Sequence, residues 1–340
     1  MPKLNILIAG STGYIGIQLI KLLINHKYVN IKYLCGNSSV GKNISYYDKS
    51  LLKKKLPKIV KFNKSFLKNI DVIFTALPNG EAQDIAKHLG KTITLIDLSA
   101  DFRLTKSSEY LKWYKQKHRS TNYIKKSIYS LPEINRQLLS NYQIISCPGC
   151  YPTSILLPLI PLFQSKLIKV KNVIIDSKSG YSGAGRGVHK KYKNKNLYES
   201  LSSYGVGFHR HNSEIHQMLS NFTKKQFDFT FTPHLSPMFR GILTTIYLDL
   251  ENGANIKKVL KKLTNFYKNE KFVKVLKGDS MISTNDVINT NNCHISVCKT
   301  KYKNKIIILS AIDNLIKGGS GQAVQNLNNK YNFPETTSLV

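Results

Sequence analysis

The sequence has no long apolar run. None of its windows approaches the roughly 18 consecutive apolar residues that a membrane-spanning helix requires. The first residues, "MPKLNILIAGSTG", pass directly into a strand-like segment, without the charged region and cleavage site of a secretory signal peptide. We therefore expect a soluble protein of the cytoplasm that does not bind membranes.

Cysteine is scarce, and the number of cysteines, five, is odd. In a chain of 340 residues this argues against a disulfide framework and indicates reduced thiols. Cys147 and Cys150 form a Cys-x-x-Cys pair in "SCPGC", which is typical of zinc sites and redox pairs as well as of a single nucleophile. No second such pair occurs in the sequence, so zinc would need ligands of another kind.

Acidic residues are few: 19 Asp and Glu stand against 51 Lys and Arg, which gives a formal net charge of +32. Such an excess suits phosphate contacts with nucleic acid. The basic residues are nevertheless scattered in short clusters at 53–55, 190–195 and 301–305, without a basic tail or a nucleic-acid-binding module. The accompanying Asn, Ile and Tyr are typical of an AT-biased coding sequence. We interpret the charge as a solvated basic surface and expect no nucleic-acid partner.

The first 150 residues alternate short β-branched runs with helical patterns. Buried strands are predicted at 4–10, 31–35, 71–77, 93–99 and 143–147, and a helix at 14–26. This alternation predicts a doubly wound parallel sheet, that is, an α/β dinucleotide-binding domain over 1–148.

After residue 170 the strand-like runs are longer, and one clear amphipathic helix is predicted at 255–269. We therefore expect a second, α+β domain over 149–317, for substrate binding and oligomerisation. The polar tail, 318–340, is expected to form a helix that returns to the first domain.

A glycine loop follows the first predicted strand. Gly10, Gly13 and Gly16 in "ILIAGSTGYIG" lie between a strand and a helix, where they permit a tight turn and a close approach of the backbone to a pyrophosphate. A plain tight turn is the alternative. The second strand ends in "YLCGNSSVGK", which has no carboxylate for the ribose hydroxyls and has Ser38, Ser39 and Lys42 instead. This favours NADP over NAD, although these residues also suit an ordinary polar loop.

The segment "CPGCYPTS" runs from a strand end into an apolar helix whose first turn carries Pro152. Cys150 would lie at that helix N-terminus, where the thiolate is favoured, whereas Cys147 would not. A nucleophilic cysteine needs a base, and "GFHRHNSEIHQ" offers His211 beside Glu214, with His209 and His216 nearby. These histidines have three interpretations: a catalytic base, a structural hydrogen-bonded group, or a metal ligand.

The chain resembles the N-acetyl-gamma-glutamyl-phosphate reductase family nearly from end to end. The resemblance lies in "GSTGYIG", "FTALPNG", "IDLSADFRL", "YSLPEINR", "PGCYPT", "SGYSGAGR", "HRHNSEI", "FTPHLSPMFRGI" and "AIDNLIKGGSGQAVQN", in the family's order. "PGCYPT" followed by "HRH" is the specific part, because related semialdehyde and glyceraldehyde-phosphate dehydrogenases typically have "CTTN" around their cysteine. Two departures stand out: Cys147 replaces the usual asparagine, and Ser213 a common proline.

The resemblance implies an NADP-dependent oxidoreductase of arginine biosynthesis that acts on a small-molecule acyl phosphate through a Cys150 thioester, with no metal, and that assembles as a homodimer or homotetramer. It implies His211 as catalytic base or acid, supported by His209 and Glu214, and Arg103 and Arg240 as substrate anchors. The expected cofactor-binding residues are Gly10, Ser11, Thr12, Gly13, Tyr14, Gly16, Ser38, Ser39, Lys42, Pro78, Ser179, Gly180, Ser182, Gly183 and Asn314.

Overall fold

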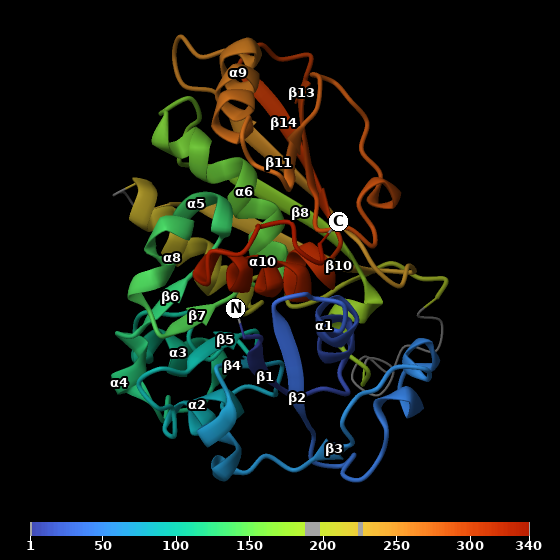
Figure 1. The fold of residues 1–340 in the computed structure, drawn as a ribbon. Helices are drawn as coiled ribbons and strands as arrows, with labels where there is room; N and C mark the ends of the chain where they lie inside the picture. Colours follow the sequence, from blue (N-terminus) through green and yellow to red (C-terminus); the bar gives the residue numbers. More distant parts are fainter. Residues whose placement is uncertain (1, 188–197, 224–226, 340) are drawn as a thin grey trace. The chain divides into compact units, whose positions relative to one another are not determined.

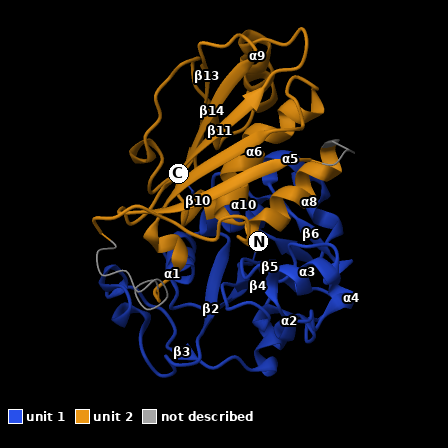
Figure 2. Ribbon diagram, turned by 180° about the vertical axis from the view of Figure 1, so that it is seen from behind, with its two compact units in different colours: residues 1–148, 319–340 blue, residues 149–318 orange. Residues whose placement is uncertain are grey.

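The computed structural model describes residues 2–187, 198–223 and 227–339 (Figure 1). They form two compact units, coloured separately in Figure 2: unit 1 is Met1–Pro148 with Gly319–Val340, and unit 2 is Gly149–Gly318. The basic cluster at 190–195 lies outside the described residues. Within the described ranges, no helix is both long and apolar enough to cross a membrane.

Unit 1 is built on a seven-stranded sheet in the order β3-β2-β1-β4-β5-β7-β6, in which every pairing is parallel. The order reverses between β1 and β4, which is the switch point where doubly wound sheets bind their ligands. The predicted fold class of this part is confirmed. The strands are β1 (Leu4–Ala9), β2 (Val29–Cys35), β3 (Ile59–Val60), β4 (Val72–Thr75), β5 (Thr94–Asp97), β6 (Ser127–Tyr129) and β7 (Ile144–Ser146).

Helices complete unit 1. The predicted N-terminal helix is α1, and its buried Ile17, Ile20 and Leu23 recur at helical spacing, which explains why this segment coils and packs on the sheet. The predicted C-terminal helix is shorter than expected, because it covers ten residues of the tail rather than all of 318–340. The helices are α1 (Tyr14–Leu23), α2 (Glu81–Ala86), α3 (Ser107–Tyr114), α4 (Thr121–Ile124), α5 (Pro132–Asn135) and α10 (Gly321–Lys330).

Unit 2 contains a mixed seven-stranded sheet in the order β12-β13-β14-β11-β8-β10-β9. Helices α6 and α9 pack on it, and α8 packs on α6 (Figure 2). The strands are β8 (Val173–Gly180), β9 (Ser202–Ser203), β10 (Phe229–Ser236), β11 (Ile242–Asp249), β12 (Val273–Val275), β13 (Cys293–Lys299) and β14 (Lys305–Ile312). The helices are α6 (Cys150–Gln164), α8 (His211–Thr223) and α9 (Ile256–Tyr267), and a π-helical turn spans Ile316–Ser320.

Helix α6 is buried on all sides from Tyr151 to Phe163, although Pro158 and Pro161 lie inside it. Pro161 has no N–H to donate to the carbonyl of Leu157, four residues earlier. The hydroxyl of Tyr267, at the end of α9, donates to that carbonyl instead. The predicted helix α9 therefore does more than cover the sheet, because it satisfies a buried acceptor that α6 cannot.

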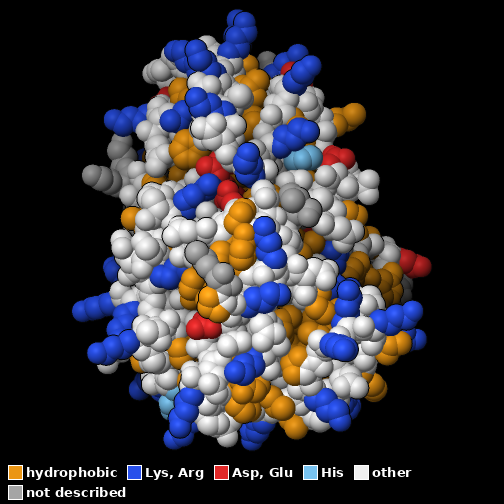
Figure 3. Space-filling view, in the orientation of Figure 1, with side chains coloured by type: hydrophobic (Ala, Val, Ile, Leu, Met, Phe, Trp, Pro, Cys, Tyr) orange, Lys and Arg blue, Asp and Glu red, His pale blue; other side chains and the backbone are white. Residues whose placement is uncertain are grey.

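Lys and Arg side chains are scattered over the face of the molecule in Figure 3, with apolar and uncharged polar groups between them. This distribution agrees with a solvated basic surface rather than a single binding stripe on that face.

His26 makes the stability of unit 1 sensitive to acid. Its ring is 1% exposed, Nδ1 accepts from the N–H of Tyr28 at 3.3 Å, and Nε2 lies 2.8 Å from Oδ1 of Asn328. An amide oxygen only accepts, so Nε2 carries the proton and the ring is neutral. Burial lowers the pKa of His26 below 6.5. The stabilisation is therefore present above pH 6.5 and is lost as the pH falls through the lower folded-state value.

We accordingly expect His26→Gln to flatten the loss of stability on acidification. Urea unfolding at several values between about pH 7.5 and pH 5 measures this. The unaltered protein and the variant are compared at each pH, because His26 is not the only group that makes stability depend on pH. Burial raises the pKa of Asp97 to about 6, and its protonation changes stability in the opposite direction. Parallel curves for the two proteins would contradict the prediction.

Candidate active site

Cys150 is the first residue of α6, as the sequence predicts. Gly149 is the N-cap, in an extended conformation (φ −66°, ψ 160°), and no side chain caps the helix. The Cys150 side chain is half-buried. The first turn of a helix leaves backbone N–H groups without an intrahelical acceptor, so its N-terminus favours negative charge. The segment "PGC" therefore brings a thiol to an electropositive helix end.

Glu214 joins α8 to the residue before Cys150. Its carboxylate is fully buried, and Oε2 accepts from the backbone N–H of Gly149 at 2.9 Å. The other oxygen, Oε1, lies 3.8 Å from Nε2 of His211, which is the first residue of α8. One carboxylate therefore holds the start of α6 and faces the imidazole, which is how a third group positions a catalytic base.

The imidazole of His211 lies directly against Gly149. A Cβ atom built on Gly149 would be 2.3 Å from Nε2 of His211, closer than side chains approach in proteins. A second glycine packs on Cys150 itself, since a Cβ on Gly318 would lie 2.7 Å from Cβ of Cys150. Gly149 and Gly318 were not predicted as site residues, although "PGCYPT" and "AIDNLIKGGSGQAVQN" contain them. They permit the close packing of this site.

His209 packs against His211 and holds its backbone. Its Nδ1 accepts from the backbone N–H of His211 at 3.2 Å, and the two rings lie 4.6 Å apart. Tyr151 packs edge-on against both rings. Its hydroxyl donates to the carbonyl of His234 at 3.0 Å and accepts from the hydroxyl of Tyr204 at 3.1 Å, and burial raises the pKa of Tyr151. Tyr151 was not predicted as a site residue, although it follows Cys150 in "PGCYPT".

Asn314 ties two loops of unit 2 together. Its Oδ1 accepts from the N–H of Gly241 at 2.7 Å, and its Nδ2 donates to Oγ of Ser182 at 2.9 Å. Ser179 donates to the carbonyl of Gly180 at 3.0 Å. A Cβ on Gly183 would lie 3.1 Å from Oγ of Ser179. Ser179 and Gly180 thus end β8, Ser182 and Gly183 lie in the turn that follows it, and Asn314 binds that turn from the segment after β14. The contact of these residues with a cofactor stays a prediction.

The two predicted substrate arginines are both bound to protein groups. Arg240 donates from Nη1 to Oδ1 of Asn289 at 2.6 Å and to Oδ2 of the fully buried Asp313 at 3.1 Å. In unit 1, Arg103 donates from Nε to the carbonyl of Cys147 at 2.8 Å. Each guanidinium thus fixes the protein chain in the structure, and a role as substrate anchor stays a prediction.

Cys147 differs from Cys150 in its burial and in its place in the fold. It is fully buried in unit 1, and Nδ2 of Asn326 lies 3.7 Å from its sulfur. Burial raises the pKa of the Cys147 thiol to about 12. A thiol of this kind is inert, because the thiolate is the reactive form. Among the residues that the structure describes, no group of three or more His, Cys, Asp or Glu is arranged to hold a metal ion.

The glycine loop of unit 1 has the geometry that a pyrophosphate site requires. Gly10 has φ +83°, and a Cβ there would lie 2.2 Å from the carbonyl oxygen of Ala76. Gly16 packs as closely on Gly10, and Gly13 is the N-cap of α1, with no side chain capping the helix. Ser11 is buried and donates to the carbonyl of Cys35 at 3.1 Å, so it ties the loop to β2.

Gly10→Ala tests this loop. We expect it to lower the stability of unit 1 by on the order of 3 kcal/mol, because alanine is strained at this φ and clashes with Ala76. NADPH binding should be lost with it. Gly90→Ala is the control, since Gly90 lies outside the glycine loop and its Cβ would meet only Ile93, at 3.7 Å or more. Thermal melting and fluorescence titration of the two variants measure the difference, and equal behaviour would contradict the prediction.

A cavity of about 440 Å³ opens beside the glycine loop, at the carboxyl ends of the strands of unit 1. The ends of β1 to β4 and helix α2 line it, so it lies where doubly wound folds hold a dinucleotide. Ser38, Ser39 and Lys42 are not among the described residues that line it. The lining residues are Ala9, Gly10, Cys35, Gly36, Asn37, Lys61, Phe62, Leu77, Glu81, Asp84, Ile85 and His88.

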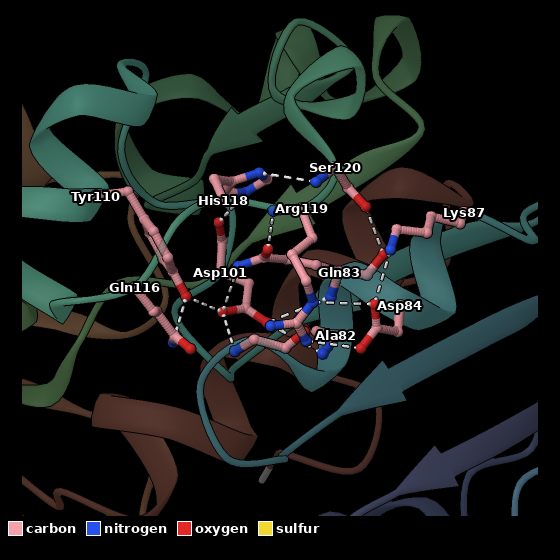
Figure 4. A network of polar contacts seen from close by, with 11 residues as sticks. Ala82, Gln83, Asp84, Lys87, Asp101, Tyr110, Gln116, His118, Arg119 and Ser120 are labelled. Atoms are coloured by element: carbon pink, nitrogen blue, oxygen red, sulfur yellow. Dashed lines mark hydrogen bonds and ion pairs between the residues drawn. The ribbon is translucent and has the colours of Figure 1, made fainter.

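A buried carboxylate, Asp101, holds the start of α2, the helix that lines one side of this cavity, through the polar contacts drawn in Figure 4. It accepts from the backbone N–H groups of Gly80, Ala82 and Gln83 at 2.7 to 3.3 Å, and so caps the start of α2 from a distant segment. The hydroxyl of Tyr110 donates to the same carboxylate at 2.7 Å. Pro78, a predicted cofactor residue, lies just before α2, and its carbonyl accepts from the N–H of Glu81. The motif "SADFR" therefore positions α2.

Two family models match the chain. The semialdehyde dehydrogenase NAD-binding domain matches residues 5–142, and the semialdehyde dehydrogenase dimerisation domain matches residues 150–314. Among solved structures, aspartate semialdehyde dehydrogenase II of Vibrio cholerae, complexed with ASA, superimposes with a TM-score of 0.71 at 14% identity, over 98% of this chain and 99% of that one. The Candida albicans aspartate semialdehyde dehydrogenase with NADP gives 0.68 at 17%, over 96% and 98%. At such identities the likeness shows the fold.

Curated relatives are much closer in sequence. The N-acetyl-gamma-glutamyl-phosphate reductase of Clostridium beijerinckii is 43% identical over 340 residues, which is 100% of this chain and 98% of that protein. The probable chloroplastic N-acetyl-gamma-glutamyl-phosphate reductase of Arabidopsis thaliana is 41% identical over 331 residues, or 97% of this chain and 82% of that protein. The similarity therefore spans both units rather than the dinucleotide-binding fold alone.

Proposed function

The chain belongs to the N-acetyl-gamma-glutamyl-phosphate reductases, which confirms the resemblance seen in the sequence, and from that premise we propose its reaction. It reduces N-acetyl-L-glutamyl 5-phosphate with NADPH to N-acetyl-L-glutamate 5-semialdehyde and phosphate, in arginine biosynthesis. Full-length similarity to relatives of that name supports the substrate. The observation that carries the chemistry is a half-buried thiol at a helix start, beside an imidazole that faces a buried carboxylate.

In this proposal Cys150 is the nucleophile. Its thiolate attacks the acyl carbon of the substrate, the bond from that carbon to the phosphate oxygen breaks, and phosphate leaves with the electron pair of that bond. A thioester remains on Cys150. The start of α6 supports this role, because backbone N–H groups at a helix N-terminus favour the thiolate and stabilise an oxyanion that forms on the acyl group.

His211 accepts the thiol proton and later returns a proton to the tetrahedral oxygen. General acid–base catalysis of this kind contributes about 10²- to 10⁴-fold. Glu214 faces His211 and favours its protonated form between the two steps, while it holds the N–H of Gly149. His209 and Tyr151 fix the imidazole from the other side. Glu214 and His209 are thus positioning residues.

NADPH, when bound, would supply the hydride that reduces the thioester to a thiohemiacetal. The thiohemiacetal would give the aldehyde as its hydroxyl loses a proton and its C–S bond breaks, so that Cys150 leaves with the electron pair as the thiolate. The glycine loop and the start of α1 would hold its pyrophosphate, since Gly10 and Gly16 allow the tight turn that leads into α1, whose N-terminus no side chain caps. The turn of Ser179, Gly180 and Ser182 is proposed for the nicotinamide end.

The natural assay runs the reaction in reverse. Purified protein with N-acetylglutamate semialdehyde, phosphate and NADP should form NADPH.

An alternative function is that of an enzyme with the same mechanism in lysine biosynthesis. It acts on a longer acyl phosphate that is carried by an acidic protein, and a basic surface would be useful for binding that protein. If NADPH formed only with the aldehyde attached to that acidic protein, the function in lysine biosynthesis would replace the one in arginine biosynthesis.

A nucleic-acid-binding protein on a borrowed dinucleotide fold is the alternative from another class. It predicts salt-sensitive binding of DNA without reductase activity. The scattered lysines and the cysteine site argue against it.

We also propose that this protein is cytoplasmic, because its five free thiols stay reduced in that compartment.

The part that matches a dimerisation domain has one sheet face that α6 and α9 cover and one that they do not. On the second face Ile174 and Tyr247 are 49% and 42% exposed. We propose that this face packs on the same face of a second copy, to give a homodimer or a homotetramer of two such dimers.

Tyr247→Lys should therefore dissociate the assembly, because it places a charge beside the exposed Ile174, with which Tyr247 is paired across β8 and β11. Sedimentation velocity of the variant should give monomers where the unaltered protein gives dimers or tetramers. Tyr302→Lys is the matched control, since Tyr302 is 54% exposed on the turn between β13 and β14. An unchanged sedimentation coefficient for Tyr247→Lys would move the interface elsewhere.

A further inference from the structure

Lys61 lies where enzymes that bind a dinucleotide contact the adenosine ribose of that cofactor. Strand β3 runs parallel to β2, with Cys35 paired to Val60, and the N–H of Gly36 donates to the carbonyl of Val60 at 3.0 Å. The residue after β3 is therefore beside the end of β2. That end is the position where NAD enzymes place an acidic residue against the ribose hydroxyls, and here it is "GN".

Lys42, the lysine that the sequence analysis put forward, belongs to the other end of β3. The loop that follows β2 turns back along β3, so that the N–H of Ile59 donates to the carbonyl of Lys42 at 3.0 Å. The ammonium of Lys42 lies 4.4 Å from the centre of the Tyr46 ring. Its backbone therefore lies beside the beginning of β3, whereas the cavity opens at the carboxyl end.

The two serines of that loop are also poorly placed to bind a phosphate in the cavity. Ser39 is 2% exposed, and its hydroxyl accepts from the hydroxyl of Tyr47 at 2.8 Å. Ser38 is exposed, but it does not line the cavity among the described residues. The loop thus pairs with β3 through its backbone, and the hydroxyl of Ser39 is bound by Tyr47.

The two walls of the cavity differ in charge. Lys61 stands on the β3 side, and no carboxylate of the described residues lies within ion-pairing distance of its ammonium. Glu81 and Asp84 stand on the α2 side, where Asp84 is paired with Arg119 at 2.6 Å and with Lys87 at 2.9 Å. The β3 wall therefore presents an uncompensated positive charge, so the cavity orients a nucleotide with its phosphate toward Lys61.

We propose that Lys61 is the residue that selects NADP over NAD, by binding the 2′-phosphate of the adenosine ribose. This inference rests on the proposed function, since it concerns the cofactor of that reaction. An ammonium at this position supplies a charge-assisted hydrogen bond to a phosphate oxygen, for which the hydroxyls of NAD offer no equivalent.

The test is equilibrium binding, measured by isothermal titration calorimetry on the full chain. The probes are NADP and NAD, and their fragments 2′,5′-ADP and 5′-AMP. Lys61→Gln should weaken NADP and 2′,5′-ADP by about tenfold or more and leave NAD and 5′-AMP within about twofold, as expected for loss of one charged hydrogen bond. Lys61→Arg should keep the preference.

Lys58→Gln is the matched control, because Lys58 is an exposed lysine at the opposite end of β3 that does not line the cavity. It should bind all four probes as the unaltered protein does. Lys42→Gln should also change the ratio of NADP to NAD affinity little.

Three results would overturn the assignment: no change in Lys61→Gln, an equal loss for 5′-AMP and 2′,5′-ADP, or the loss of preference in Lys42→Gln instead. If the unaltered protein bound neither NADP nor 2′,5′-ADP, the proposed function would fail together with the role of Lys61. If it bound both tightly and Lys61→Gln did so too, only the role of Lys61 would fail.

Discussion

Cys150→Ala should abolish turnover, with a loss of at least about 10⁴-fold, because no thioester forms without the sulfur and an essential catalytic group contributes on that scale. NADPH binding should remain, since the glycine loop is untouched. The measurement combines the reverse-direction assay with a fluorescence titration of NADPH. Retained turnover would show that the reaction does not pass through this thiol.

The chain supplies its own control for that experiment. Cys147→Ala removes an equal group three residues earlier, but from a fully buried position. The pKa of about 12 leaves the Cys147 thiol without a reactive thiolate at neutral pH. We expect activity to be retained, with a stability loss on the order of 1 kcal/mol from the small cavity. If both variants lost activity equally, a redox or metal pair would be favoured over a single nucleophile.

The features that the sequence predicted well are those encoded over a few neighbouring residues. The parallel sheet follows from short β-branched runs between helical patterns, and the start of α6 at Cys150 follows from Pro-Gly and Pro152. The helix predicted at 255–269 is observed as Ile256–Tyr267. In each case the period or the turn chemistry is local, so it can be read before the fold is known.

What the sequence did not predict depends on contacts between distant segments. Asp101 caps α2 from about twenty residues away along the chain. Tyr267 completes the hydrogen bonding of α6 across more than one hundred residues. The short strand β3 has two residues, too few for a periodic pattern, so the placement of Lys61 beside the end of β2 had no signal.

The site itself was predicted as a set of residue types, and the structure adds how closely they pack. Cys150, His211 and Glu214 were named for their chemistry. The glycines beside them were not, because a glycine needed for a close approach looks like any other glycine until its neighbour is known. Of the two glycines, Gly149 makes the closer approach, and its neighbour is the imidazole of His211.

Gly149→Ala should therefore damage catalysis without removing any catalytic group. The added methyl would lie 2.3 Å from Nε2 of His211, so the imidazole must move away from the start of α6. Misplacement of a catalytic group by about 1 Å costs on the order of 10²-fold in rate. We expect kcat to fall by about that factor, while NADPH affinity stays unchanged because the change lies outside the glycine loop.

The readout that separates this from general destabilisation is the pH profile. A displaced His211 no longer faces Glu214, so the acid limb of kcat/KM should shift in Gly149→Ala, and His211→Asn should remove that limb. Gly90→Ala is the control, because its Cβ would make only ordinary contacts with Ile93, at 3.7 Å or more. If Gly149→Ala melted early but kept the normal profile, its cost would be structural. An unchanged profile in His211→Asn would instead transfer the proton to another group, with His209 the nearest imidazole in the described site.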